Sequence, residues 1–281
     1  MPVVPGARAR QTFARLVQGP EGALDLAVAA LLIAKEEYPD LDVSQYLARL
    51  DAMAAQVAAR LVPGASPHEV IDGLNRYLFE EQGFHGSAEK YYDPRNSFLN
   101  DVLDRRIGIP ITLSTVYIEL GRRLEFPIRG VGFPGHFLVK YAAGQTEIVL
   151  DPFHGGAILS HAACADRLRQ MYGDQLSFEP SLLAPVGPRQ ILARMLANLK
   201  AIYLQSHQYA KALAAVERIL LLAPDAPEEL KARAILLAHL DREGEAIAAF
   251  ETYLARAPEV PDAEAVKKRI VQLRRHIAML N

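Results

Sequence analysis

The sequence predicts an α+β unit that is followed by an all-α array of helices. Residues 22–124 carry apolar side chains at helical spacing, and residues 128–150 form short β-branched and aromatic runs separated by glycine and proline. Residues beyond 190 repeat with a period of 34. Helices followed by a small sheet are typical of the α+β class. We therefore expect an N-terminal helical segment at 1–65 that packs on a core at 66–175, and a helical domain at 190–281.

The composition limits the function. The chain has 281 residues, a net charge of −2 and a single cysteine, Cys164. One cysteine cannot form an internal disulfide or a cysteine-rich metal motif, and the charge gives no reason to expect nucleic acid or an anionic membrane as a partner. The most apolar run, 23–34, contains Asp25 and is too short to span a bilayer. We expect a cytoplasmic protein without a cofactor, whose oligomeric state the composition does not indicate.

Helix signals follow one another along the first hundred residues. A short helix is expected within 1–20, and apolar stripes predict helices over 22–38 and 43–61. Ser66-Pro67-His68-Glu69 is a capping box with proline at the first helical position, which predicts a helix start. A further short helix is expected at about 97–106. The small sheet must then come from later residues.

The periodicity changes between Pro110 and Leu150. The apolar residues Leu113, Val116, Tyr117, Leu120 and Leu124 share one helix face, and the polar residues Thr112, Thr115, Glu119, Arg122 and Arg123 take the other. Pro110 lies in the first turn, where its missing N–H is harmless. Short runs at 128–133, 136–141 and 147–150 predict antiparallel strands. The Gly-x-Gly-x-x-Gly at 130–135 is followed by a strand instead of a helix, which excludes a dinucleotide site.

A proline-rich stretch at 174–190 is expected to link the core to the repeats. Residues 34 apart match in pairs, among them Ala212 with Ala246 and Pro224 with Pro258. This period resembles the tetratricopeptide repeat, over about 193–260. Arg233 departs from the pattern, because the equivalent position of the first repeat, Leu199, is apolar. A last helix, with Val266, Ile270, Leu273 and Ile277 on one face and Lys267, Lys268, Arg269, Arg274 and Arg275 in solvent, would cover the stack. The resemblance implies a protein partner in the groove of the array.

Three short motifs resemble the transglutaminase-like (papain-like) core. Gly108-Ile109-Pro110 matches its Gly-x-Cys helix start, His136 its strand histidine and Asp151-Pro152 its Asp-Pro. The chain is similar in particular to a bacterial SirB-type family, in which such a core precedes tetratricopeptide repeats. The residues that carry this resemblance are 96–100 (with Asn96 and Asn100), 106–111, 134–137 (with Gly135) and 151–156 (with His154). The resemblance implies architecture more than mechanism.

Pro110 stands where the resemblance implies a cysteine nucleophile. Proline has no nucleophilic atom, so thiol acyl transfer through position 110 is excluded. Ser114, one turn later on the same face, is the best substitute, with Thr112 as another, but both are further from the field of the helix terminus. Structural roles are favoured for these hydroxyls. Cys164, in an expected helix beyond the core, is predicted to be a small buried residue.

His136 and Asp151 admit two interpretations. They are either a retained base and its orienting acid, or a pair that braces the sheet against the helix, which we favour. A metal site from His85, His136, His154, His161 and Asp151 is not expected, because their spacing fits no local ligand motif. The sequence thus favours a non-catalytic regulatory or scaffold protein. The alternative is a hydrolase or acyltransferase, with Nδ1 of His136 near Asp151 and a hydroxyl or water near Nε2.

Overall fold

The computed structural model describes residues 6–87 and 91–280. The chain divides into two compact units, residues 1–195 and residues 196–281. The boundary falls within helix α8 (Pro188–Gln205).

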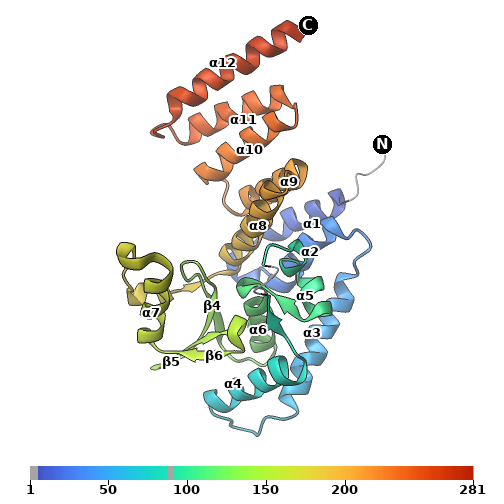
Figure 1. The fold of residues 1–281 in the computed structure, drawn as a ribbon. Coiled ribbons are helices and arrows are strands. Elements are labelled where there is room, and N and C mark those ends of the chain that lie inside the picture. The colour runs from blue at the N-terminus through green and yellow to red at the C-terminus, as the bar shows by residue number, and fades with distance from the viewer. Residues whose placement is uncertain (1–5, 88–90, 281) are drawn as a thin grey trace. The chain divides into compact units, whose positions relative to one another are not determined.

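The helices of the first unit are α1 (Ala7–Val17), α2 (Leu26–Glu37), α3 (Val43–Ala58), α4 (Pro67–Asn75), α5 (Leu99–Arg105), α6 (Pro110–Arg123) and α7 (His161–Tyr172) (Figure 1). Two of them begin at the predicted signals, α4 at the capping box and α6 at Pro110. The capping box of α4 is confirmed, since the backbone N–H of Ser66 donates to Glu69 Oε2 at 2.7 Å and that of Glu69 to Ser66 Oγ at 3.4 Å. A π-helical segment, Arg76–Glu81, continues α4.

Five antiparallel strands form the sheet of the first unit. They are β3 (Ile128–Val131), β4 (Leu138–Ala143), β5 (Thr146–Asp151), β6 (Ala157–Leu159) and β7 (Pro185–Val186), in the spatial order β6-β5-β4-β3-β7. A separate parallel pair joins β1 (His85–Gly86) to β2 (Ile107–Gly108). The three predicted strands are confirmed. The stretch at 174–190, expected to be only a link, instead contributes β7 to the sheet edge.

Helix α6 is the central helix of this unit, and three of the five residues on its predicted polar face are buried. It contacts α2, α3 and α5 as well as β3 and β4. Thr112 and Thr115 are fully buried and Glu119 is 1% exposed, although the sequence pattern placed all three toward solvent. A helix surrounded by other elements buries its whole circumference, so its polar groups must find partners inside the protein.

Helix α7 lies beside the sheet (Figure 1). Val131, Leu138 and Val149 of the sheet form an apolar cluster with Cys164 and Leu168 of α7. Side chains alternate between the two faces of a strand, so Asp151, two residues after Val149, also faces α7. Cys164 is buried, as expected, and burial raises the pKa of its thiol.

The second unit is helical and repetitive. Its helices after α8 are α9 (Tyr209–Leu222), α10 (Pro227–His239), α11 (Glu243–Arg256) and α12 (Ala263–Leu280). The period of 34 is confirmed: Ala212 and Ala246 are both fully buried, and the turn residues His207 and Asp241 share a left-handed φ of 55° and 56°. No described helix is long and apolar enough to cross a membrane.

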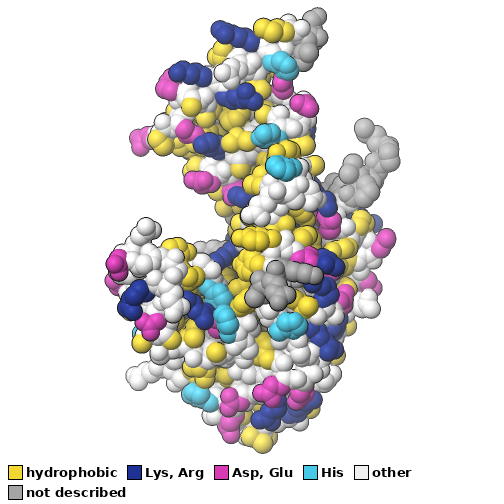
Figure 2. All heavy atoms as spheres, viewed as in Figure 1, with side chains coloured by type: hydrophobic (Ala, Val, Ile, Leu, Met, Phe, Trp, Pro, Cys, Tyr) yellow, Lys and Arg dark blue, Asp and Glu magenta, His cyan; other side chains and the backbone are white. Residues whose placement is uncertain are grey.

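The surface mixes charges of both signs. On the face drawn in Figure 2, Lys and Arg side chains are interspersed with Asp and Glu. The basic residues of α12 are exposed, while Val266, Ile270 and Leu273 are buried, so the predicted solvent face of this helix is confirmed.

Candidate functional site

The carboxylate of Asp151 is the centre of a polar cluster. Asp151 ends β5, is fully buried, and accepts hydrogen bonds from four groups. Its Oδ1 lies 2.9 Å from His136 Nε2 and 3.1 Å from the backbone N of Phe153. Its Oδ2 lies 2.7 Å from His154 Nδ1 and also binds Arg167 of α7. These four residues, Asp151, His136, His154 and Arg167, are the Asp151 cluster.

A glycine turn positions His136 just before β4. Gly135 has a left-handed φ of +66°, and a Cβ there would lie 2.9 Å from the Tyr172 hydroxyl. Glycine is required because α7 approaches this backbone so closely. Arg194 fixes the turn from the other side: its guanidinium donates to the carbonyl of His136 at 2.6 Å and to that of Phe133 at 3.2 Å. Burial lowers the pKa of Arg194.

His154 is placed by a tight turn after β5. A 3-10 segment, Pro152–His154, begins at Asp151, whose side chain caps it. Phe153 packs edge-on against the His136 ring at 5.9 Å. It also lies against β1, where a Cβ on Gly86 would come within 2.6 Å of the Phe153 ring. The turn after β5 therefore brings the His154 ring to Oδ2 of Asp151, while the turn before β4 brings the His136 ring to Oδ1.

The cluster stabilises the ionised carboxylate. Burial alone would raise the pKa of Asp151. The hydrogen bond and charge of His136, with the hydrogen bonds from Arg167 and His154, outweigh burial and hold the pKa of Asp151 well below its usual range. At neutral pH the site contains a buried anion surrounded by donors.

The His136 ring presents the opposite nitrogen from the one expected. The hydrolase or acyltransferase alternative required Nδ1 of His136 near Asp151, whereas Nε2 makes this hydrogen bond. Nδ1 then remains the nitrogen that could exchange a proton with another group. No described residue hydrogen-bonds to it.

The start of α6 is held by its own backbone and by Asn96. Pro110 is buried at the first helical position, and Ile109 caps the helix. The Thr112 hydroxyl accepts from the Ile109 N–H at 3.0 Å and donates to the Asn96 carbonyl at 2.8 Å. A Cβ on Gly108 would lie 2.8 Å from the same hydroxyl. Thr112, Asn96 and Gly108 therefore stabilise the N-terminus of α6.

Comparison with known proteins places the chain in a family. Residues 44–197 match the model of the transglutaminase-like superfamily, and residues 199–271 match a tetratricopeptide repeat. A UPF0162 protein of Xylella fastidiosa is 36% identical over 253 residues, which is 89% of this chain and 90% of that protein. The chain belongs to the UPF0162 family of transglutaminase-like proteins. The SirB-type resemblance is confirmed.

Two further relatives show how far the likeness extends. A UPF0162 protein of Vibrio cholerae is 30% identical over 249 residues, covering 88% of this chain and 92% of that protein. The human F-box only protein 21 is 31% identical over 139 residues, which is 47% of this chain and 21% of that protein. No solved structure matches.

The remaining sequence candidates of this UPF0162 chain are dispersed. Ser114 is fully buried on α6, and its hydroxyl, like Oδ1 of Asn100, has no described hydrogen-bond partner. The ring of His85 bonds the Gly83 carbonyl at 3.0 Å, and that of His161 packs 5.5 Å from Phe178. Neither histidine is part of the Asp151 cluster.

The donor set of the Asp151 cluster is a poor match for a metal ion. Ligating atoms of His136, Asp151 and His154 lie within 4.8 Å of one another. The guanidinium of Arg167 already binds Asp151 Oδ2, and each histidine donates to a different oxygen. A cation here would face the charge of Arg167 at close range.

Sequence reasoning missed Arg167 and Arg194, which bind the cluster and its turn. Each lies on a later helix, and no motif surrounds either residue. Only the packing of α7 and α8 in the first unit brings them to β5 and to the His136 turn.

Proposed function

We propose that this UPF0162 protein is a non-catalytic binding protein, in which a transglutaminase-like core without a nucleophilic cysteine accompanies a protein-binding tetratricopeptide array. The observation that carries this proposal is Pro110 at the first helical position of α6. A thiolate at that position would gain from the positive end of the helix dipole. Proline offers no atom for acyl transfer.

The number of hydrogen bonds that Asp151 accepts supports the same proposal. An acid that only orients a catalytic histidine needs one hydrogen bond to the ring. Asp151 accepts from His154, Arg167 and the Phe153 backbone as well. These contacts tie β5, the turn after it and α7 together, which suits a bracing role.

A groove in the second unit supports protein binding. It has a volume of about 330 Å³ and lies among α10, α11 and α12, with Ile235, Phe250 and Val266 on its apolar wall. Ile235 is 39% exposed although it is a large aliphatic residue. An exposed aliphatic residue in a groove that Lys231 and Arg269 also line is the kind of surface that a partner covers.

Affinity capture with the full-length protein tests this groove. Ile235→Glu places a charge on the apolar wall, and Val271→Glu is the matched control, because Val271 is 44% exposed on α12 and does not line the groove. The amount of partner captured from lysate of the native cells should fall at least about tenfold with Ile235→Glu and should not change with Val271→Glu. Equal capture by both variants and the unaltered protein would reject the groove as the binding surface.

A hydrolase or acyltransferase is the second candidate function. The observation that favours it is the hydrogen bond of 2.9 Å between His136 Nε2 and Asp151 Oδ1. Such a bond orients an imidazole whose Nδ1 could take a proton from a hydroxyl or water. The candidate requires a His136-dependent nucleophile, so labelling with electrophilic acyl probes distinguishes the two functions.

A further inference from the structure

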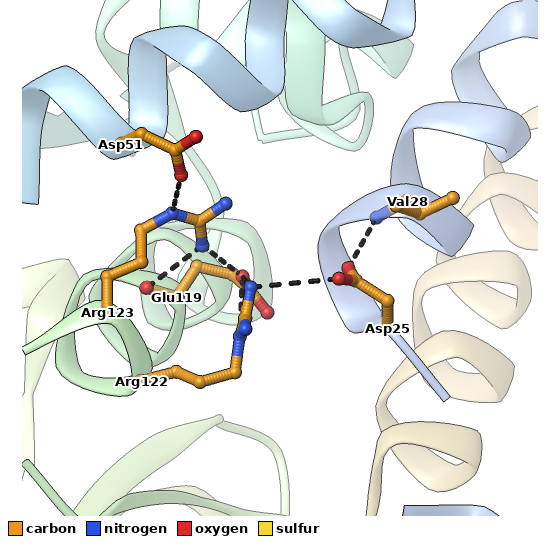
Figure 3. Close-up of polar contacts among 6 residues, drawn as sticks. All are labelled: Asp25, Val28, Asp51, Glu119, Arg122 and Arg123. Atoms are coloured by element: carbon orange, nitrogen blue, oxygen red, sulfur yellow. Dashed lines mark hydrogen bonds and ion pairs between the residues drawn. The ribbon is translucent and has the colours of Figure 1, made fainter. Parts of the chain in front are cut away.

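Glu119 is a buried carboxylate near the C-terminal end of α6 and is not part of the Asp151 cluster. It is 1% exposed. Arg122 donates to its Oε2 through Nε at 3.2 Å and Nη2 at 3.0 Å, and Arg123 donates to the same oxygen. Arg123 also binds Asp51 at 2.6 Å, and Arg122 lies 3.7 Å from Asp25 (Figure 3). The network joins α6 to α3 and to the start of α2.

Only one oxygen of the Glu119 carboxylate is used. The dashed lines to this carboxylate in Figure 3 all end on Oε2, and no described residue donates a hydrogen bond to Oε1. Oε1 therefore keeps acceptor positions that water or a ligand can occupy.

Glu119 lines a pocket of about 270 Å³ in the first unit. Leu24, Ile118, Phe126 and Ile191 supply apolar wall. A pocket of this size, with an apolar lining and few polar groups, suits a small molecule. We refer to it as the Glu119 pocket.

The charged residues that line the Glu119 pocket are two acids, Glu119 and Glu125, and two arginines, Arg122 and Arg129. Arg122 already binds Oε2 of Glu119. Glu125 and Arg129 are exposed, and neither has a described side-chain partner. A positively charged donor group would complement Oε1 and Glu125, and a negative group on the same molecule would complement Arg129.

We propose that the Glu119 pocket binds a small molecule in which an ammonium group is joined to an apolar body. The ammonium group donates to Oε1 of Glu119, and the apolar body packs against Ile118 and Phe126. Both a free apolar amino acid and the corresponding amine have this chemistry. In an amino acid the carboxylate would contact Arg129. This proposal does not depend on the proposed function.

Titration of the full-length protein with three matched molecules tests the proposal. L-leucine has both charged groups, 3-methylbutylamine lacks the carboxylate, and 4-methylpentanoate lacks the ammonium group. In calorimetry, the two ammonium compounds should bind at millimolar concentration, and 4-methylpentanoate at least about tenfold more weakly. If the natural ligand is an amino acid, Arg129→Gln should weaken the binding of leucine and leave the binding of 3-methylbutylamine unchanged. If it is an amine, Arg129→Gln should change the binding of neither compound. Equal binding of 4-methylpentanoate, or no binding by either ammonium compound, would overturn the proposal.

Two variants locate the binding. Glu119→Gln removes the charge while keeping the shape, and should weaken both ammonium compounds at least about tenfold. Ile118→Trp fills the pocket without touching the charge network and should abolish binding, whereas Ile158→Trp, on β6 where Ile158 is 53% exposed, should not. Thermal unfolding shows whether each variant is folded. Unchanged binding by folded Ile118→Trp would contradict the assigned site, even if Glu119→Gln failed to fold.

Discussion

Nε2 of His136 lies 2.9 Å from Oδ1 of Asp151, and the other oxygen of that carboxylate is bound by His154 and Arg167. A histidine and an acid in hydrogen-bond contact are usual in acyl-transfer sites. In this chain the acid also holds a turn and a helix, so its removal should affect stability first.

Asp151→Ala should destabilise the protein by about 3–5 kcal/mol, because it leaves Arg167 and two histidines without their buried anion. Urea unfolding followed by circular dichroism measures this change. Asp174→Ala is the control, since Asp174 is an exposed residue just after α7. Equal unfolding midpoints for the two variants would show that the cluster does not brace the fold.

The same carboxylate predicts a pH dependence. The pKa of Asp151 is lowered in the folded state, so the unfolded chain binds more protons at acid pH. Its contribution is present above the unfolded value of about 4 and is lost as the pH falls below it. The stability advantage of the unaltered protein over Asp151→Asn should therefore shrink between about pH 5 and pH 3. An advantage that stayed constant over this range would contradict the lowered pKa.

Gly156→Ala should be far more damaging than Gly155→Ala. Both glycines have left-handed φ, +75° and +68°, so both substitutions are strained. A Cβ at Gly156 would lie 2.0 Å from Oδ1 of Asn75, whereas one at Gly155 meets nothing within 4 Å. Asn75 also accepts from Tyr117 at 3.1 Å and donates to the Gly156 carbonyl.

We expect a loss of about 1 kcal/mol for Gly155→Ala and at least about 3 kcal/mol for Gly156→Ala. Thermal unfolding of the two variants, side by side, gives the comparison. Similar midpoints would mean that Asn75 does not hold the turn after Asp151.

Much of the fold was predictable because its signals are local. The capping box at Ser66, the proline start of α6 and the β-branched and aromatic runs in β4 and β5 each act within a few residues. The repeat was predictable because closely packed helices require a small residue at the same position of each repeat, here Ala212 and Ala246. His136 and Asp151 were found through short motifs that resemble a known core.

The rest depends on contacts between distant segments. The sequence pattern placed Glu119 toward solvent because helical periodicity depends only on the polarity of each residue. It cannot show that Arg122 and Arg123 neutralise Glu119 inside the protein. Arg167 and Arg194 reach the site from later helices, and β7 joins a sheet whose other strands end before residue 160. No local pattern marks these residues.

Labelling with electrophilic acyl probes tests the central claim most directly. The full-length protein and His136→Ala are treated with the probes, and modified residues are identified by peptide mass spectrometry. A non-catalytic core predicts that no labelling depends on His136, because Pro110 replaces the thiol and Thr112 and Ser114 are fully buried. Modification of Ser114 or Thr112 that disappears in His136→Ala would contradict the claim and support the hydrolase or acyltransferase instead.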